Sequence, residues 1–518
     1  MISLILVMVC AIAAGWLARR IHVPYPIVLV LAGIGLGVVY TWPALDLGPD
    51  AVLAIVIPAV LYPAAIDTSW RDFRVMLRPI LLLAIGLVAT TTLAVGLALK
   101  WLVPGVPWSV AFALGAIVSP PDAVAATAVL RRFRLPRRIV TLLEGESLVN
   151  DATGLVLYRF AVVAALTGTF SGPALVGQFA LIALGGLAVG IGVGLVSTRL
   201  QRHLRDPMLE LAMSLTAPFV AYWLCEVLDV SGVLGVVAAG LYRSRWSHRR
   251  SSAIARLNIR TVWGAIVFVI NSFVFVLIGI QMPQIAESLV GGDGLSRPRA
   301  AALVAALSAV AIGVRFLWIF TATYGVRLLV PSIERVDPAS ARVSTLVGWS
   351  GMRGVVSLAA AVALPTALES GEPFPERSLV ILLAYGIVFV TLVGQGLTLP
   401  VLIRWLRIKA DSSGDDETRL ARDAMRRAAT HAVDKLVAEH GFPAHEAVAV
   451  KRFFNSRSRA REEGAVGADR ETRLWLGASS AQRDALIELW KRGEIGDDVL
   501  IRLERELDLA EARLPQDE

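Results

Sequence analysis

The chain has 518 residues, of which 56% are hydrophobic and 18% are charged, and its mean hydropathy is +0.66. This apolar excess is well above that of a soluble globular domain, so the sequence predicts an integral membrane protein. The formal net charge of +8 does not indicate nucleic-acid binding, because the arginines lie at the ends of apolar runs rather than on one basic face with interleaved aromatic residues.

The positions of the two cysteines bear on disulfide bonds and metal sites. Cys10 and Cys225 lie in different apolar runs, far apart in the sequence, so neither a disulfide framework nor a metal cluster is expected. The first apolar run has no basic leading segment and no small-residue cleavage site, so we expect a retained helix rather than a signal peptide. No cofactor is expected.

Apolar runs of about 17 to 30 residues predict about thirteen membrane-spanning segments. Every second connection is basic, as in the cytoplasmic loops of membrane proteins. An odd number of spans with a basic tail inside places the N-terminus outside the cell and the C-terminus in the cytoplasm. The expected spans lie near residues 2–18, 24–40, 51–66, 78–103, 108–131, 138–167, 174–198, 208–226, 230–242, 261–282, 300–326, 341–367 and 378–403. The basic connections include Arg19 and Arg20, "RRFRLPRR" at 131–138, "RSRWSHRR" at 243–250, and Arg404, Arg407 and Lys409.

Charge density divides the chain into two parts. Residues 1–406 are expected to form an all-α polytopic membrane domain. Residues 407–518 are densely charged and carry apolar residues at helical spacing, as in "RLARDAMRRAATHAVDKLVAEH" at 419–440, which predicts a cytoplasmic domain of amphipathic helices. A regulatory role and a stabilising dimer contact are equally compatible with this pattern.

The stretch "EGESLVNDATGLVLY" at 144–158 places a cluster of polar residues inside an expected span. Asp151 lies close to the middle of that span, where a charge is costly. At 3.6 residues per turn, Ser147 and Asp151 lie on one stripe of the helix, and Glu146 and Asn150 lie on the adjoining stripe. All four side chains therefore point into one sector, which implies a polar cavity.

The stretch "SPPDAVAA" at 119–126 lies in the middle of another expected span. Pro120 and Pro121 remove two amide donors, so the helix should break there. Free main-chain groups are tolerated at membrane depth only where they line a cavity or are buried in protein. Asp122 follows the break, where the positive N-terminus of the restarted helix favours its ionised form.

A third stretch, "GWSGMRGVVS" at 348–357, combines three glycines with an intramembrane cation. The glycines weaken the helix around Arg353, which needs an anionic partner at that depth. Glu146 is the expected partner, because a buried ion pair satisfies both charges. The two broken spans are seven apart, so they cross the membrane in opposite directions, which suggests inverted repeats of about six spans whose interrupted helices meet at a midplane site.

The carboxylates and one further arginine have different expected roles. Asp122 and Asp151 outnumber the nearby cations, and no structural benefit of that surplus is evident, so we assign them to function. Arg159, two turns after Asp151, either pairs with an acid or reaches the outer interface.

Together, "SPPDAVAATAV", "EGESLVNDATGLVLY" and "GWSGMRGVVSLAAA" resemble the signature stretches of the NhaP-type bacterial sodium/proton antiporters, which belong to the monovalent cation:proton antiporters and are relatives of animal sodium/hydrogen exchangers. The resemblance implies a thirteen-helix homodimer in the bacterial cell membrane. It further implies that a six-helix core domain moves against a dimerisation domain and carries the ion across.

The resemblance also implies roles for individual residues. The aspartate that matches Asp151 binds the cation and the proton in turn, and the asparagine that matches Asn150 supports it. Glu146 and Arg353 match the ion pair of the family's core domain. The remaining groups that the resemblance places around the transported sodium are the Ser147 hydroxyl, main-chain oxygens at Pro120 and Pro121, and the nearby Asp122.

Two positions depart from the family pattern. Many relatives have threonine where this chain has Pro121, and relatives often have glutamate where this chain has Pro63. Both departures remove an oxygen ligand, so they leave the choice among sodium, lithium and potassium open.

The expected function is that of a secondary transporter, not an enzyme, that exchanges sodium for protons. Desolvation favours the neutral form of a carboxylate, so protons and sodium would compete for Asp151. Because Asn150 is neutral, exchange of one ion for one proton is expected to be electroneutral. A potassium/proton antiporter is the main alternative. An intramembrane aspartyl protease with Asp122 and Asp151 as its dyad is a weaker one, because it does not explain Asn150 or Arg353, and a pure channel would not need a titratable carboxylate.

Overall fold

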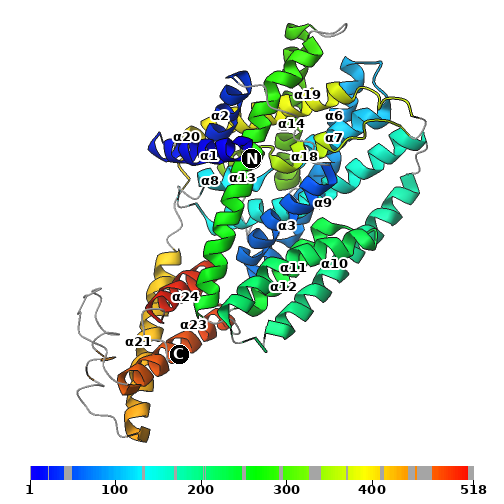
Figure 1. Cartoon of the computed structure of the whole chain (residues 1–518). Helices are drawn as coiled ribbons and strands as arrows, with labels where there is room; N and C mark the ends of the chain where they lie inside the picture. The colour runs from blue at the N-terminus through cyan, green and yellow to red at the C-terminus, as the bar shows by residue number, and fades with distance from the viewer. Residues whose placement is uncertain are drawn as a thin grey trace. The chain divides into compact units, whose positions relative to one another are not determined.

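A computed structural model of the chain is almost entirely helical over the residues that it describes, apart from one isolated bridge between Ala367 and Pro373 (Figure 1). The described residues are 2–21, 23–39, 49–130, 133, 135–168, 172–201, 203–204, 206–247, 253–290, 296–325, 340–368, 371–408, 413–440, 448, 450–451 and 469–511. Parts of the expected basic loops lie outside them, namely residues 131, 132, 134 and 248–250 and Lys409.

The chain forms two compact units. The membrane unit comprises Met1–His203, Ala212–Arg249 and Trp263–Ala410, and the tail unit comprises Leu204–Leu211, Arg250–Val262 and Asp411–Glu518. The expected boundary near residue 406 stays a prediction.

The first half of the chain contains long helices and one π-helical turn. These are α1 (Ile2–Arg20), α2 (Tyr25–Val39), α3 (Pro49–Asp67), α4 (Trp70–Val75), α5 (Leu77–Leu81), the π-helical η1 (Leu82–Leu87), α6 (Val88–Leu102), α7 (Trp108–Val118), α8 (Ala123–Leu130), α9 (Arg137–Thr167), α10 (Gly172–Gln201), α11 (Pro207–Val227) and α12 (Gly232–Ser247).

The second half continues the same pattern and ends in the tail helices. Its helices are α13 (Ala253–Val290), α14 (Arg297–Phe320), the π-helical η2 (Thr321–Gly325), α17 (Ala341–Trp349), α18 (Val355–Val362), α19 (Arg377–Phe389), the π-helical η3 (Val390–Gln395), α20 (Gly396–Leu406), α21 (Ser413–His440), α23 (Asp469–Arg492) and α24 (Asp497–Glu511).

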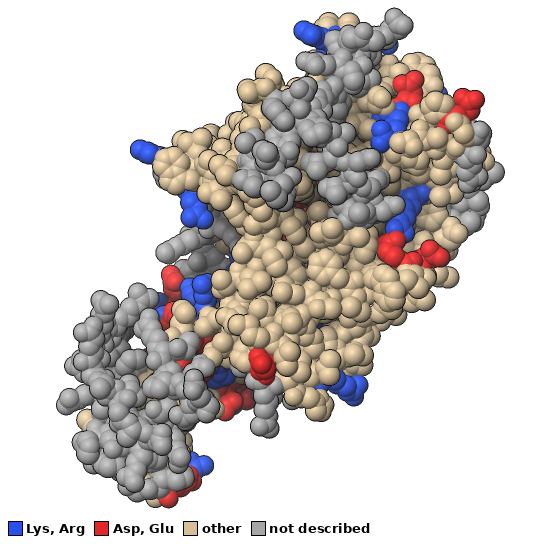
Figure 2. All heavy atoms as spheres, in the orientation of Figure 1, with Lys and Arg blue, Asp and Glu red and all other residues tan. Residues whose placement is uncertain are grey.

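Seven helical stretches of the described chain are long and apolar enough to cross a membrane. Shorter apolar helices accompany them, and Figure 2 shows a broad uncharged surface with charged side chains mainly at its margins. The chain is therefore a polytopic all-α membrane protein, as its hydropathy predicts. The count of thirteen spans and the inverted repeats stay predictions.

Helix α9 occupies the interior of the membrane unit. It packs against α7, α8, η1 and α5, and it also contacts α3, α6 and α12 (Figure 1). A helix that is surrounded by other helices can keep polar side chains away from lipid, because those side chains face protein. This packing explains how α9 tolerates its central polar cluster.

In the tail unit, α21 packs against α23, and α24 contacts both. The apolar stripes of these helices form small cores, one of which includes Ala421, Leu486, Val499 and Leu503. The helical spacing of apolar residues in the tail thus has a direct structural counterpart.

A buried charge network holds the tail unit together. Arg256, in the first turn of α13, donates to both carboxylate oxygens of Asp508 at 2.9 and 2.5 Å, and it lies 3.8 Å from Glu504. Arg483 on α23 contacts Asp508 at 2.9 Å and Glu511 at 2.8 Å. Burial alone would lower the pKa of the Arg483 guanidinium, but Glu511 and Asp508 raise it above its ordinary value. The first turns of α13 belong to the tail unit, so all the partners of this network lie within that unit.

We expect Asp508→Ala to loosen the tail helices, because Arg256 and Arg483 lose a shared buried partner. Breaking a buried ion pair costs about 3–5 kcal/mol, so trypsin should cleave α23 and α24 of the purified full-length protein about tenfold faster or more. Asp423→Ala is the matched control, because it removes only the exposed partner of Arg426 and should change the cleavage rate little. Equal cleavage of the two variants would contradict the role of Asp508.

Candidate ion-binding site

The first expected helix break is present. Helix α7 ends at Val118 and α8 begins at Ala123, so Pro120 and Pro121 lie between two helices inside one expected span. The prediction from the two prolines is confirmed, and its cause is the loss of two amide donors together with the steric restriction before each proline.

The second expected break is present as well. Helix α17 ends at Trp349 and α18 begins at Val355, and residues 350–354 between them are not helical. Arg353 lies in this non-helical segment and is almost fully buried. The glycine-rich stretch therefore interrupts its helix as predicted.

The two breaks contact each other. The backbone N–H of Asp122 donates to the Met352 carbonyl at 2.6 Å. A Cβ atom added at Gly354 would lie 1.7 Å from the Asp122 carboxylate oxygen Oδ2, so this position accommodates only a hydrogen atom. Gly354 is therefore needed for close packing against Asp122, in addition to weakening the helix.

Helix α9 lies against the first break. The Asn150 side-chain amide donates to the Pro121 carbonyl at 2.8 Å. A Cβ atom at Gly154 would lie 2.9 Å from Pro120 Cγ and 3.4 Å from the Ala116 carbonyl oxygen. The amide of Asn150 thus supplies a donor to a carbonyl that the helix break leaves free, and Gly154 lets the two helices approach.

Helix α9 contacts the helices on both sides of each break, and the place where it meets the two breaks is called the crossing. Asp151 follows Asn150 on α9, interacts electrostatically with Asp122 at the first break, and is only 6% exposed. No hydrogen bond or ion pair joins its carboxylate to another residue of the described chain. Its neighbour Asn150 is fully buried, and the Asn150 Oδ1 atom accepts no hydrogen bond from the described residues. Ser147, one turn earlier on α9, is partly buried. The site therefore offers carboxylate and amide oxygens that are not engaged by protein donors.

Glu146 has a partner that the sequence analysis did not identify. Arg315 on α14 donates to both carboxylate oxygens of Glu146, at 2.5 and 2.9 Å, and both side chains are almost fully buried. Arg315 also donates to the Val347 carbonyl at 3.2 Å, and its side chain fills the space beside Gly351. The structure therefore corrects the expected pair of Glu146 with Arg353, because Arg315 takes the place of Arg353.

Arg353 is bound by main-chain oxygens instead. Its Nε donates to the Val118 carbonyl at 3.0 Å and its Nη1 to the Gly351 carbonyl, while its backbone N–H donates to Thr391 Oγ1 at 3.3 Å. Val118 is the last residue of α7, where the helix dipole is negative and the carbonyls lack helical partners. The broken helix thus provides the counter-charge that we expected from a glutamate.

The signal for Arg315 was present in the sequence. It is a single arginine in the apolar run 300–326, and an intramembrane cation requires an anionic or carbonyl partner wherever it occurs. The same reasoning that identified Arg353 applies to Arg315. What the sequence lacks is the information that decides which of two arginines reaches Glu146.

Arg159 pairs with an acid, which is one of its two expected roles. Its guanidinium donates to the Glu226 carboxylate of α11 at 2.9 and 3.3 Å, and both side chains are substantially exposed. An exposed pair of this kind contributes little to stability. Arg159 therefore lies outside the buried site.

We expect Arg315→Gln to lower the melting temperature of the purified protein, because Glu146 is left as a buried charge without its partner, at a cost of about 3–5 kcal/mol. Glu146→Gln/Arg315→Gln removes both charges and should recover most of the loss. The matched control adds Glu146→Gln to Arg353→Gln. It should recover less of the melting temperature lost by Arg353→Gln alone, because Arg353 binds main-chain carbonyls. If Glu146→Gln raised the melting temperature of Arg353→Gln but not that of Arg315→Gln, the observed pairing would be contradicted.

Comparisons with known proteins agree with this architecture. Residues 5–405 match the family described as sodium/hydrogen exchanger, transmembrane. An uncharacterized Na+/H+ exchanger of Mycobacterium tuberculosis is 35% identical over 526 residues, which cover 98% of this chain and 95% of that protein. A sodium, potassium, lithium and rubidium/H+ antiporter of Bacillus subtilis is 30% identical over 507 residues, which cover 95% of this chain and 75% of that protein.

A solved structure shares the fold. The sodium proton antiporter MjNhaP1 of Methanocaldococcus jannaschii, determined at pH 8, matches with a TM-score of 0.61 and 18% identity, and the match covers 78% of this chain and 97% of that chain. The family match spans most of the chain and includes both helix breaks and the polar cluster of α9. This chain therefore belongs to the sodium/hydrogen exchanger family and is a multi-pass membrane protein.

Proposed function

We propose that this protein is a secondary transporter that exchanges sodium for protons across the membrane, and that Asp151 binds the cation and the proton in turn. The observation that carries the proposal is the buried Asp151 carboxylate at the crossing of the two helix breaks, with no donor or cation paired to it in the described chain. Membership of the sodium/hydrogen exchanger family, whose members are transporters rather than enzymes, supports this class of activity.

The charges around the crossing support one-for-one exchange. Three carboxylates, Glu146, Asp122 and Asp151, lie with two guanidinium groups, Arg315 and Arg353. With both aspartates ionised, this set carries one net negative charge. One bound sodium ion or one proton makes it neutral, and a neutral set is far less costly to move through a low-dielectric region than a charged one. The loaded forms therefore cross and the empty form does not, which couples the two fluxes.

Oxygen ligands for sodium are available at the same place. Sodium is a hard cation and prefers oxygen ligands. Asp151 supplies a carboxylate, Asn150 an unengaged amide oxygen, and Ser147 a hydroxyl one turn away on α9. The helix break contributes main-chain carbonyls at Pro120 and Pro121, although the Pro121 carbonyl already accepts from Asn150.

Potassium/proton exchange is the second candidate. The relative in Bacillus subtilis, and a second one in Bacillus pumilus, carry names that include sodium, potassium, lithium and rubidium. In this chain Pro121 and Pro63 stand where oxygen-bearing side chains are common in the NhaP-type pattern. Fewer side-chain oxygens leave more of the coordination to water and main-chain groups, which relaxes selection by ion size.

Several further features belong to the proposal. We propose an N-terminus outside the cell, a cytoplasmic tail beginning near residue 407, and a homodimer in the bacterial cell membrane. In this arrangement the helices that carry the two breaks move relative to the dimer contact. The alternation of basic loops and the antiparallel broken helices support this topology.

We expect Asp151→Asn to abolish sodium-driven proton flux in proteoliposomes that contain a pH-sensitive dye, because a neutral amide takes up no proton near neutral pH and gives a bound sodium ion no counter-charge. The variant should elute as the folded wild-type protein does. Asp229→Asn is the matched control, because Asp229 is exposed and has a positive φ of 51°, which asparagine tolerates, and its flux should be unchanged. Retained flux in Asp151→Asn would refute the carrier role.

We expect Gly354→Ala to reduce exchange to near background, because the added Cβ would lie 1.7 Å from Asp122 Oδ2 and must displace that carboxylate. Gly264→Ala on α13 is the matched control, since a Cβ there meets no atom within 4 Å. Both fluxes are measured with sodium and potassium gradients in turn. Normal exchange by Gly354→Ala would show that the contact between the breaks does not position the site.

A further inference from the structure

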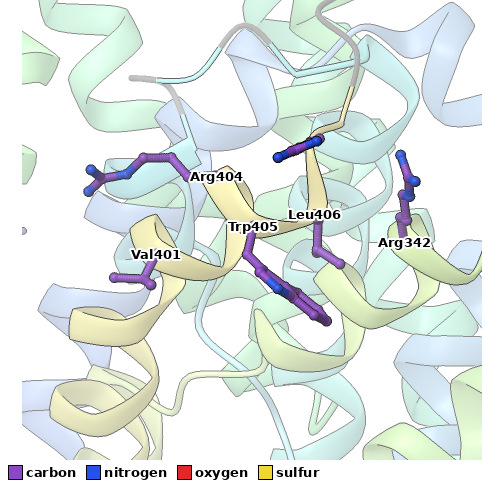
Figure 3. Close-up of a pocket in the computed structure, with 6 residues that line it drawn as sticks. Arg342, Val401, Arg404, Trp405 and Leu406 are labelled. Carbon is purple, nitrogen blue, oxygen red and sulfur yellow. The ribbon is translucent and has the colours of Figure 1, made fainter.

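A basic cavity lies beside the start of α17, the helix that leads into the second break, and the end of α20. Its volume is about 750 Å³. Figure 3 shows Arg404 and Arg342 on opposite sides of the view, with Trp405 and Leu406 between them. The lining residues are Arg342, Val401, Arg404, Trp405, Leu406 and Arg407.

Three guanidinium groups surround this cavity. No acid of the described chain forms an ion pair with Arg342, Arg404 or Arg407. The Arg404 Nε donates to the carbonyl of Pro400, one turn earlier on its own helix, at 3.2 Å. Arg407 has a φ of 46°, which is uncommon for a residue with a side chain, and this left-handed turn ends α20 beside the cavity. Cations that gather around one cavity, with no acidic partner among the described residues, favour an anionic ligand.

Exposed apolar side chains adjoin the same cations. Trp405 is 75% exposed and Val401 is 62% exposed. Both lie in the last two turns of a membrane-spanning stretch that ends at Leu406. Tryptophan and arginine at the end of a span are typical of the headgroup level of a membrane. A soluble anion would need only the arginines, whereas a lipid would also use the apolar surface.

We propose that this cavity binds the phosphate group of an anionic phospholipid. Arg342 and Arg404 hold the phosphate from the two helix ends, and Arg407 adds a third positive charge. Trp405 and Val401 contact the glycerol and the beginning of the acyl chains. Basic pockets between membrane-spanning helices suit anionic lipid headgroups for this combined reason.

The position of the cavity links lipid binding to transport. Helix α17 leads directly into the second break, and its Trp349 side chain donates to Thr398 Oγ1 of α20 at 2.9 Å. A phosphate held by Arg342 and Arg404 would fix the same two helices to each other at their ends. Exchange should therefore be faster in membranes that contain an anionic phospholipid than in neutral ones.

Binding is measured on the purified full-length protein by native mass spectrometry with phosphatidylglycerol, phosphatidylcholine and inorganic phosphate. Wild type should retain phosphatidylglycerol over phosphatidylcholine. Arg342→Gln/Arg404→Gln should bind it about 25-fold more weakly, about fivefold for each arginine. Arg342→Lys/Arg404→Lys keeps the charges, shows whether the site tolerates substitution, and should retain the preference for phosphatidylglycerol.

The matched control is Arg19→Gln/Arg20→Gln at the end of α1, where both arginines are exposed and Arg20 lies over the Trp16 ring at 5.3 Å. This variant loses two positive charges beside a tryptophan, as Arg342→Gln/Arg404→Gln does, but it should bind phosphatidylglycerol as wild type does. An equal loss in the control, equal binding of the two lipids, or displacement of the lipid by millimolar inorganic phosphate would overturn the proposal.

Transport in the same samples separates this proposal from the proposed function. Sodium-driven proton flux is compared in vesicles with and without phosphatidylglycerol. Selective lipid binding that is lost in Arg342→Gln/Arg404→Gln supports the lipid site whether or not flux is observed. Absence of flux in every vesicle would overturn sodium/proton exchange, not the lipid site. Flux that is present and independent of phosphatidylglycerol would overturn the effect of the lipid on transport.

Discussion

The contact between two broken helices is the constraint on which the site depends. Main-chain groups at membrane depth need partners, because lipid offers none. Here the breaks satisfy one another, since the Asp122 N–H donates to Met352, the Val118 carbonyl accepts from Arg353, and Asn150 donates to the Pro121 carbonyl. Each of these bonds crosses from one segment to another, so the crossing is held from several sides.

Glu146, Arg315 and Arg353 are bound to protein groups, whereas Asp151 is not paired with another described residue. Arg315 neutralises Glu146 through two hydrogen bonds, and Arg353 is held by carbonyls at the end of α7. Both arginines therefore stabilise the helices around the site. The two arginines balance two of the three carboxylates Glu146, Asp122 and Asp151, so one negative charge remains for a cation or a proton to balance, which is the property that a carrier of monovalent cations and protons requires.

The sequence was sufficient to locate the two breaks and the polar cluster of α9, because prolines, glycines and intramembrane carboxylates have local physical consequences. It was not sufficient to pair the charges. Two intramembrane arginines compete for Glu146, and only the packing of α14 against α17 decides that Arg315 reaches it. The steric role of Gly354 against Asp122, and the network of Arg256 with the tail, likewise depend on contacts between segments that are distant in the chain.

The net charge of the crossing determines whether exchange responds to voltage, and the ion gradients at which net flux is zero reveal this response. Proteoliposomes are given a fixed sodium gradient and a series of opposing proton gradients, at two clamped membrane voltages. If one sodium ion exchanges for one proton, net flux is zero where the sodium and proton concentration ratios are equal, and we expect this point to be the same at both voltages. A zero-flux point that shifts with voltage would rule out electroneutral exchange, because it would show that the site moves a net charge with each cycle.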